Sequence, residues 1–179
     1  RAVWIYIIGM PLPKSLRLQF SRLEESDAPF ILELVNEPGW LQHIGDRNIH
    51  DLAAAEAYIS NGPAKSHAQH GFGLDRVSLA ETGEVLGICG LIQRDYLDAP
   101  DIGYAFLQAH AGQGYASEAA QAVVDQARQA LGLRKLYALT SPDNLASMRV
   151  LEKCGFAFIK LLHAPAAIAP SRLFEIVFK

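Results

Sequence analysis

The residues of this sequence best suited to chemistry lie in the stretch Ala-Gly-Gln-Gly-Tyr-Ala-Ser-Glu-Ala at positions 111–119. Glycine carries no Cβ, so the N–H groups around Gly112 and Gly114 are open to a ligand. Apolar residues of helical spacing follow, and a helix that starts here directs the positive end of its dipole at the loop. The stretch therefore predicts a site for a phosphate or pyrophosphate. The alternative is a glycine turn that merely starts a helix.

Two common phosphate-binding motifs do not fit this loop. No Lys-Ser or Lys-Thr pair follows Gly114, as a P-loop requires. The pattern Gly-x-Gly-x-x-Gly is also missing, and the loop follows an antiparallel meander instead of opening a βαβ unit. The loop is therefore neither a P-loop nor a dinucleotide fingerprint.

Hydrophobic periodicity predicts the elements that position the loop. Strand patterns cover residues 16–20, 72–79, 85–93, 101–107, 135–140, 156–162 and 172–178. Helix patterns cover residues 28–35, 51–59, 117–131 and 144–154, with a loop at 40–47 and a stop at Asn-Gly-Pro 61–63. This order predicts an α/β (α+β) sheet of about six or seven strands with helices on its faces.

Two blocks of residues resemble a known family. The first is Gly-Tyr-Ala-Phe-Leu at 103–107 with the glycine loop, and the second is Thr-Ser-Pro-Asp-Asn-Leu-Ala-Ser at 140–147 with Val-Leu-Glu-Lys-Cys-Gly-Phe at 150–156. They resemble the GNAT superfamily of acyl-CoA-dependent N-acyltransferases, in the branch of the ribosomal-protein alanine/serine N-terminal acetyltransferases. The resemblance covers about residues 15–160. One departure is Ala111, where the family usually has Arg or Gln, so side-chain support for the pyrophosphate is weaker here.

The resemblance implies a mixed, mostly antiparallel sheet of six to seven strands, with helices on both faces and a splayed central strand pair. The co-substrate it implies is acetyl-CoA, whose pantetheine arm would lie between the strands at 101–107 and 135–140. Its pyrophosphate would lie on the N–H groups of the glycine loop. The implied acetyl-CoA-binding residues are Phe106, Leu107, Gly112, Gln113, Gly114, Tyr115, Ala116, Ser117, Asn144 and Ser147.

The implied reaction is direct attack of a neutral primary amine on the thioester. Ser147 matches the family position that protonates the departing thiolate, and the alternative is a capping serine beside Asn144. Asn144 itself would bind pantetheine or a water, or act only as the helix cap. Asp101 begins the strand that borders the acceptor pocket and is the candidate general base, the alternative being a solvated residue at a strand start.

The acceptor is a protein N-terminus or a small-molecule amine, and the sequence does not choose between them. We expect the pocket to be shaped by aromatic and ionisable residues of the loop at 40–47 and its neighbourhood, although each one singly is more often a surface or packing residue. These residues are Trp40, His43, Asp46, Arg47, Tyr58, His70 and Phe72. The alternative function is a catalytically inactive acyl-CoA-binding or sensor domain.

Composition narrows the partners and cofactors to be expected. The net charge is −3, from 16 basic and 19 acidic residues, and no basic block interleaves with aromatic residues, so no nucleic-acid partner is expected. Cys89 and Cys154 lie in apolar contexts and are expected to be buried thiols of a cytoplasmic protein. The histidines show no metal-type spacing, so no metal is expected.

The predicted domain organisation is an N-terminal extension at 1–14, whose apolar run is too short to span a bilayer, and one domain at 15–179. No membrane partner is expected. Members of the branch that the chain resembles are monomers or dimers, so a monomer or a homodimer is expected.

Overall fold

The computed structural model describes residues 10–163 and 169–179, so residues 1–9 of the predicted extension lie outside it. Its strands are β1 (Leu18–Arg22), β2 (Leu74–Leu79), β3 (Val85–Ile92), β4 (Asp101–Phe106), β5 (Lys135–Thr140), β6 (Ala157–Leu162) and β7 (Ser171–Val177). Its α-helices are α1 (Ala28–Val35), α2 (Pro38–His43), α3 (Leu52–Ile59), α4 (Lys65–His70), α5 (Tyr115–Gln129) and α6 (Leu145–Lys153). Short 3-10 turns cover Glu25–Asp27 and Gln108–His110, and a π-turn covers Ser60–Ala64.

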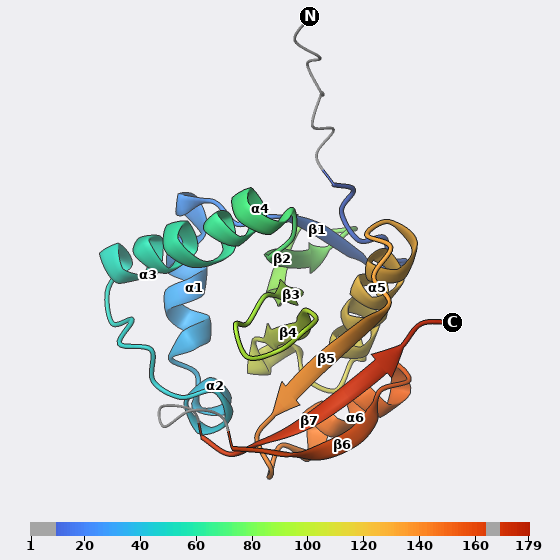
Figure 1. Cartoon of the computed structure of the whole chain (residues 1–179). Coiled ribbons are helices and arrows are strands. Elements are labelled where there is room, and N and C mark those ends of the chain that lie inside the picture. Colours follow the sequence, from blue (N-terminus) through green and yellow to red (C-terminus); the bar gives the residue numbers. More distant parts are fainter. Residues whose placement is uncertain (1–9, 164–168) are drawn as a thin grey trace, which may run out of the picture.

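The seven strands form a single sheet in the order β1-β2-β3-β4-β5-β7-β6. All neighbours are antiparallel except β4 and β5, which are parallel. Figure 1 shows β5, β7 and β6 as one wing that diverges from the strands β1 to β4. The predicted fold class, a mixed and mostly antiparallel sheet of six to seven strands, is confirmed.

Helices cover both faces of the sheet, as predicted. On one face, α5 and α6 pack on the sheet through a cluster that includes Val123, Leu151 and the β3 residue Cys89. On the other face, α1, α2 and α3 bury Ile31, Trp40 and the β3 residue Ile88. Successive residues of a strand point to opposite faces, so Ile88 and Cys89 anchor the two layers of helices to the same central strand.

The central pair of strands separates after two residues. Only Asp101↔Tyr137 and Ile102↔Ala138 pair across β4 and β5, although each strand has six residues. Beyond Ile102, β4 continues beside β3, and β5 continues beside β7. The predicted splayed pair is therefore present, and its open side faces the loop that follows β4.

The prediction of a loop over residues 40–47 is wrong in its first half, because α2 occupies Pro38–His43. Pro38 lies between the helix pattern predicted at residues 28–35 and this loop. Proline also suits the first turn of a new helix, since the N–H that it lacks has no acceptor there. Burial of Trp40, only 8% exposed, holds this short helix against α1.

The predicted helix stop at residues 61–63 is also wrong. The helical path continues from α3 through the π-turn Ser60–Ala64 into α4 and ends at Gly71, whose φ is +77°. Pro63 lies inside the π-turn and is buried. A wider turn tolerates the missing N–H of a proline because the local hydrogen-bond pattern is already changed there.

The ends of other predicted elements shift by a few residues. Helix α5 begins at Tyr115 and ends at Gln129, two residues earlier at each end than predicted, because Gly114 at φ +81° turns the chain directly into the helix.

Cys89 and Cys154 are free and buried, as predicted. Within residues 10–163 and 169–179, no helix has the length and apolar character needed to cross a membrane.

A β-carbon on Gly90 of β3 would lie 1.9 Å from the carbonyl oxygen of Gly73. Because the obstacle is backbone, we expect Gly90→Ala to lower the free energy of unfolding by about 1–3 kcal/mol or more. Gly39→Ala is the matched control, because nothing lies within 4 Å of its β-carbon position in α2. Urea titration of both variants measures the effect, and equal stabilities would contradict the close approach of the two chains.

Candidate functional site

The glycine loop has the geometry of an anion site. Gly112 and Gly114 both have left-handed φ angles, +77° and +81°, which other residues adopt only with strain. The first hydrogen bond of α5 runs from the N–H of Glu118 to the carbonyl of Gly114, at 3.1 Å. The N–H groups of Tyr115, Ala116 and Ser117 precede that bond, so they have no acceptor within the helix. They are therefore available to a ligand at the positive end of α5.

Arg17, which the sequence analysis did not select, holds this loop in place. Its Nε lies 2.6 Å from Oε2 of Glu118, and its terminal nitrogens lie 3.2 Å from the carbonyl of Gln113. The guanidinium also lies 4.7 Å from the centroid of the Tyr115 ring. A cation from the segment before β1 thus lies beside the loop whose residue Ala111 supplies none. Only the fold brings these residues together, because nearly a hundred positions separate them in the sequence.

Glu118 is the carboxylate end of this contact. Burial alone would raise the pKa of Glu118, but hydrogen bonds from the Ser15 hydroxyl and from Arg17 outweigh it and lower that pKa. Glu118 therefore stays ionised near neutral pH and fixes the guanidinium of Arg17 against the loop. Because Arg17 is 46% exposed, the ion pair serves the geometry of the loop more than the stability of the protein.

At the opening between β4 and β5, the hydroxyl of Ser147 meets the hydroxyl of Tyr104. The two oxygens lie 2.9 Å apart, and the Tyr104 hydroxyl also lies 3.1 Å from the carbonyl oxygen of Ser147. Burial raises the pKa of Tyr104, so its hydroxyl keeps its proton. The side chain of Asn144 accepts a hydrogen bond from the N–H of Ser147 at 3.0 Å, which is the cap anticipated for α6. The sequence analysis missed Tyr104, although its place in the motif beginning at Gly103 was a signal.

A cavity of about 1450 Å³ lies between the helices α1 to α4 and the splayed strands. Many of the predicted site residues line it, and they come from both the acetyl-CoA-binding and the acceptor sets. They are Trp40, His43, Arg47, Tyr58, His70, Asp101, Phe106, Ala116, Asn144 and Ser147. The fold therefore brings the two sets together around one space.

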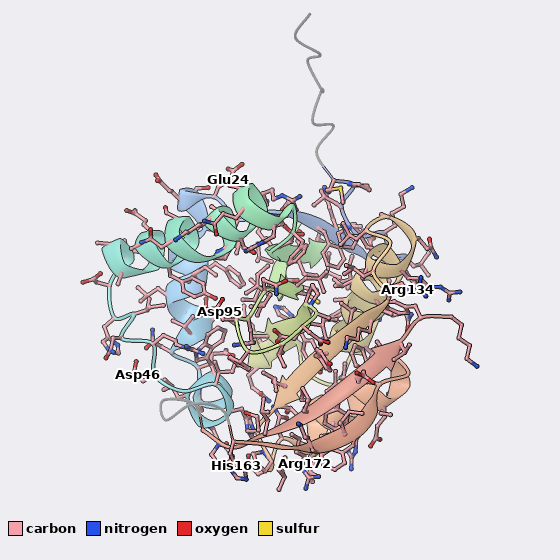
Figure 2. The ribbon with its side chains drawn as sticks, viewed as in Figure 1. Glu24, Asp46, Asp95, Arg134, His163 and Arg172 are labelled. Atoms are coloured by element: carbon pink, nitrogen blue, oxygen red, sulfur yellow. The ribbon has the colours of Figure 1, made fainter. Side chains whose placement is uncertain are left out.

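Several predicted residues do not line this cavity. Asp46 is turned outward, with its carboxylate 2.7 Å from the N–H of Asn48 and 3.5 Å from His50 Nε2, and Figure 2 shows it on the outer side of the loop after α2. Phe72 packs against the core on the α5 face of the sheet. Leu107 is buried among α1 and α3, and its N–H is already bonded to the carbonyl of Leu86 at 2.9 Å. The other predicted residues that do not line the cavity belong to the glycine loop and the first turn of α5. They are Gly112, Gln113, Gly114, Tyr115 and Ser117.

Two aromatic residues of the cavity wall carry polar groups. The Nε1–H of Trp40 is buried without a hydrogen-bond acceptor among the described residues, so it can donate to a bound acceptor molecule. Burial raises the pKa of Tyr58, and the nearby charge of Arg47 only partly offsets it. Both groups are therefore neutral hydrogen-bond donors at physiological pH.

Asp101 lies on the cavity wall, but its carboxylate is not free. It is 1% exposed, and its Oδ1 lies 2.8 Å from Nε of Arg94, a partner that the sequence analysis missed. Burial raises the pKa of Asp101 to about 6, against the opposing effect of Arg94. The reading of Asp101 as a solvated residue at a strand start is therefore wrong. Among the described residues, no group of three or more histidine, cysteine or acidic side chains is placed to hold a metal ion.

Comparison with known proteins agrees with this geometry. A family model described as the acetyltransferase (GNAT) domain matches residues 17–157. YkkB, an uncharacterized protein of Bacillus subtilis (strain 168), is 30% identical over 149 residues, which are 82% of this chain and 85% of YkkB.

Solved structures share the fold. An acetyltransferase from Agrobacterium tumefaciens str. C58 matches with a TM-score of 0.78 at 26% identity, covering 98% of each chain. RimL, a ribosomal L7/L12 alpha-N-protein acetyltransferase solved in complex with coenzyme A, also gives 0.78, at 19% identity, over 94% of this chain and 97% of RimL. At that identity, the likeness to RimL concerns the fold alone.

The burial of Asp101 predicts a specific pH dependence of stability. Its folded pKa of about 6 exceeds the ordinary value of 3.8, so between these values the native state binds more protons than the unfolded state. The stability contributed by the protonated carboxyl is complete below the lower value and is lost as the pH rises through the upper one. Asp101→Asn cannot titrate, so the unfolding free energy of the wild type should fall relative to the variant by about 3 kcal/mol across this window. Urea titrations at several pH values measure this difference, and parallel pH profiles would contradict it.

Proposed function

This chain belongs to the GNAT acetyltransferase family, and from that premise we propose that it transfers an acetyl group from acetyl-CoA to a primary amine by direct attack. The observation that carries the proposal is the split between β4 and β5. Within the described residues, it leaves one edge of β4 beyond Ile102 unpaired, and it opens beside both the Ser147 hydroxyl and the cavity. Unpaired strand edges bind extended groups that carry amides, and the pantetheine arm is such a group.

The residues present fit acetyl-CoA along its length. The N–H groups at the head of α5 that have no acceptor within the helix suit its pyrophosphate, and nothing lies within 4 Å of the β-carbon position of Gly112 in the loop before them. Phe106 and Ala116 line the cavity between this loop and the opening of the strands. Acetyl-CoA supplies the activated acetyl group, and the protein supplies position and protons.

Ser147 is proposed as the proton donor to the departing thiolate. Its hydroxyl lies at the opening of the strands and contacts the hydroxyl of Tyr104, which keeps its proton because it is buried. Tyr104 therefore remains a neutral hydrogen-bond partner that orients the hydroxyl of Ser147. Asp101 remains a candidate base, with its carboxylate held by Arg94.

The acceptor is a protein N-terminus or a small-molecule amine. An α-amino group, with a reference pKa of about 7.7–8.0 against about 10.4 for lysine, is the easier of these amines to deprotonate at neutral pH. The large cavity has room for several residues of a peptide or for a small amine. The alternative, an inactive acyl-CoA sensor, is not favoured by the family of the chain.

A thiol-release assay with acetyl-CoA tests the reaction. The acceptor panel holds peptides with N-terminal alanine or serine, free amino acids, polyamines and aminoglycosides. We expect turnover with one class of amine, and calorimetry with CoA reports binding separately. CoA binding without turnover on any amine would favour the sensor, and no CoA binding at all would overturn the family-based proposal.

Gly114→Ala should weaken CoA binding. A β-carbon at φ +81° strains the loop and shifts the N–H groups that would hold the pyrophosphate. We expect the Kd for CoA and the KM for acetyl-CoA to rise by about 10-fold, which is about 1.4 kcal/mol. Gly132→Ala is the matched control, because Gly132 also has a left-handed φ, +60°, and open space around its β-carbon position, but it follows α5. Equal CoA affinities in the two variants would remove the loop from the binding site.

Ser147→Ala should slow the chemical step without weakening CoA binding. The variant keeps the backbone N–H that Asn144 caps, so α6 retains its start. Loss of a general acid should lower kcat by roughly 100-fold. Tyr104→Phe should lower kcat less, because the Ser147 hydroxyl remains. Steady-state kinetics on the fastest amine of the panel measure both variants, and an unchanged kcat for Ser147→Ala would contradict the assignment of the donor.

A further inference from the structure

His43 belongs to a chain of three hydrogen-bonding side chains at the cavity wall. It is the last residue of α2, and its Nδ1 lies 2.8 Å from the hydroxyl of Ser141, the residue that follows β5. That hydroxyl lies 2.9 Å from Oδ1 of Asp143. Neither Ser141 nor Asp143 was a predicted site residue, and His43 was predicted only as a substrate contact.

The directions of these bonds follow from the protons available. The hydroxyl of Ser141, with the N–H of the Asp143 backbone and the side chain of Gln42, lowers the pKa of Asp143, so its carboxylate is ionised and only accepts hydrogen bonds. Ser141 has one proton and donates it to Asp143. Its oxygen must then accept from Nδ1–H of His43. The carboxylate, 3.5 Å from Nδ1, favours a proton on the same nitrogen.

A neutral imidazole with its proton on Nδ1 has its lone pair on Nε2. In the described part of the chain, Nε2 of His43 has no hydrogen-bond partner, and the side chain is 22% exposed on the cavity wall. The arrangement of a carboxylate, a hydroxyl and an imidazole therefore leaves an unprotonated nitrogen on a residue that lines the cavity.

The position of His43 relative to Ser147 follows from one turn of backbone. The carbonyl of Ser141 accepts a hydrogen bond from the N–H of Asn144 at 3.1 Å, and the side chain of Asn144 accepts from the N–H of Ser147 at 3.0 Å. His43 and Ser147 are thus fixed to the two ends of the turn that leads into α6. Both line the same cavity.

We propose that His43 is the general base that removes a proton from the acceptor amine through Nε2, and that Ser141 and Asp143 are positioning residues that set its tautomer. This inference rests on the proposed acetyl transfer. Asp101 is less suited to the task, because it is buried and its carboxylate is bound to Arg94. Imidazole is the side chain used most often as a general base near neutral pH.

The proton balance of the step is complete. An N–H bond of the acceptor ammonium breaks, and its proton goes to Nε2 of His43. The freed lone pair of the amine forms a C–N bond with the thioester carbonyl carbon, and the C–S bond breaks with its electron pair on sulfur. Ser147 gives its proton to that sulfur, and a second proton from the amine nitrogen restores the hydroxyl. His43 then releases its proton to water.

The charged groups around His43 come from several elements. Asp143 faces it from the turn after β5, while Glu37, which precedes α2, and Arg47, four residues after His43, line the same cavity. Arg172 of β7 reaches the same turn, with its Nε 3.4 Å from the carbonyl of Pro142. Glu37 already accepts a hydrogen bond from the N–H of Gln108 at 2.9 Å.

The tautomer of His43 is tested first, because this measurement needs no acceptor amine. Long-range ¹H–¹⁵N spectra of histidine-labelled protein with CoA added should show His43 protonated at Nδ1 and bare at Nε2. Ser141→Ala should mix the two tautomers without unfolding the protein. A proton on Nε2 of neutral His43 in the wild type would overturn the proposal whatever the activity.

The base is tested by the pH dependence of kcat/KM for the fastest amine of the panel. In the wild type, kcat/KM should level off at a pH below the pKa of the amine. In His43→Gln it should drop about 100-fold near neutral pH and keep rising up to the pKa of the amine itself, with an unchanged Kd for CoA. Ser141→Ala and Asp143→Asn should give smaller losses, and His50→Gln, an exposed histidine off the cavity wall, is the matched control.

The outcomes separate the two proposals. A wild-type profile retained in His43→Gln but lost in Asp101→Asn would overturn the assignment of His43 and leave acetyl transfer intact. A wild type that acetylates no amine would overturn the proposed function and, with it, the role of His43. Should His43→Gln fail to fold, the tautomer spectra and the Ser141→Ala profile still decide the question.

Discussion

The separation of β4 from β5 is the constraint on which the rest of this structure depends. Buried backbone groups must find hydrogen-bond partners, so a sheet opens only where something else fills the opening. Here the pairing stops after Ile102↔Ala138, and the sheet continues as two wings that diverge around a cavity. The opening also lets Tyr104 reach across to Ser147 at the head of α6. The same break in pairing thus creates an open strand edge, a cavity and a contact between two hydroxyls.

A second constraint is that the glycine loop is held from outside its own segment. Glycine allows the shape of the loop but gives it no rigidity. The ion pair of Arg17 with Glu118 restrains the loop instead. A partly exposed ion pair adds little to the free energy of folding. Its value lies in fixing the carbonyl of Gln113 and the ring of Tyr115, so that the N–H groups at the head of α5 keep their direction.

Two ionisable groups of the cavity wall illustrate how burial changes chemistry. Asp101 is almost completely enclosed, so its charge is unfavourable and its carboxylate is held by Arg94. His43 is more exposed, and among the residues that the structure describes only its Nδ1 has a hydrogen-bond partner. A general base needs an atom that a substrate can reach and that has no other hydrogen-bond partner. A pKa shifted by burial alone does not provide such an atom.

The sequence by itself determined much of this protein. Alternating and helical patterns located the seven strands, and the motifs around Gly114 and Ser147 indicated the family and the splayed pair. The patterns failed at α2 and at the π-turn containing Pro63, because proline both ends and starts helices, and the burial of Trp40 and Pro63 decides which.

Only the tertiary structure decided which polar and charged side chains contact one another. Arg17 with Glu118, Arg94 with Asp101 and His43 with Ser141 are joined by folding. Asp46 and Phe72 were selected for their chemistry, yet the structure turns Asp46 to solvent and packs Phe72 against the core. Residue type and spacing report the local backbone and the face that is buried. The direction of a side chain, and the group it meets, depend on how distant elements pack, and the local sequence contains no record of that packing.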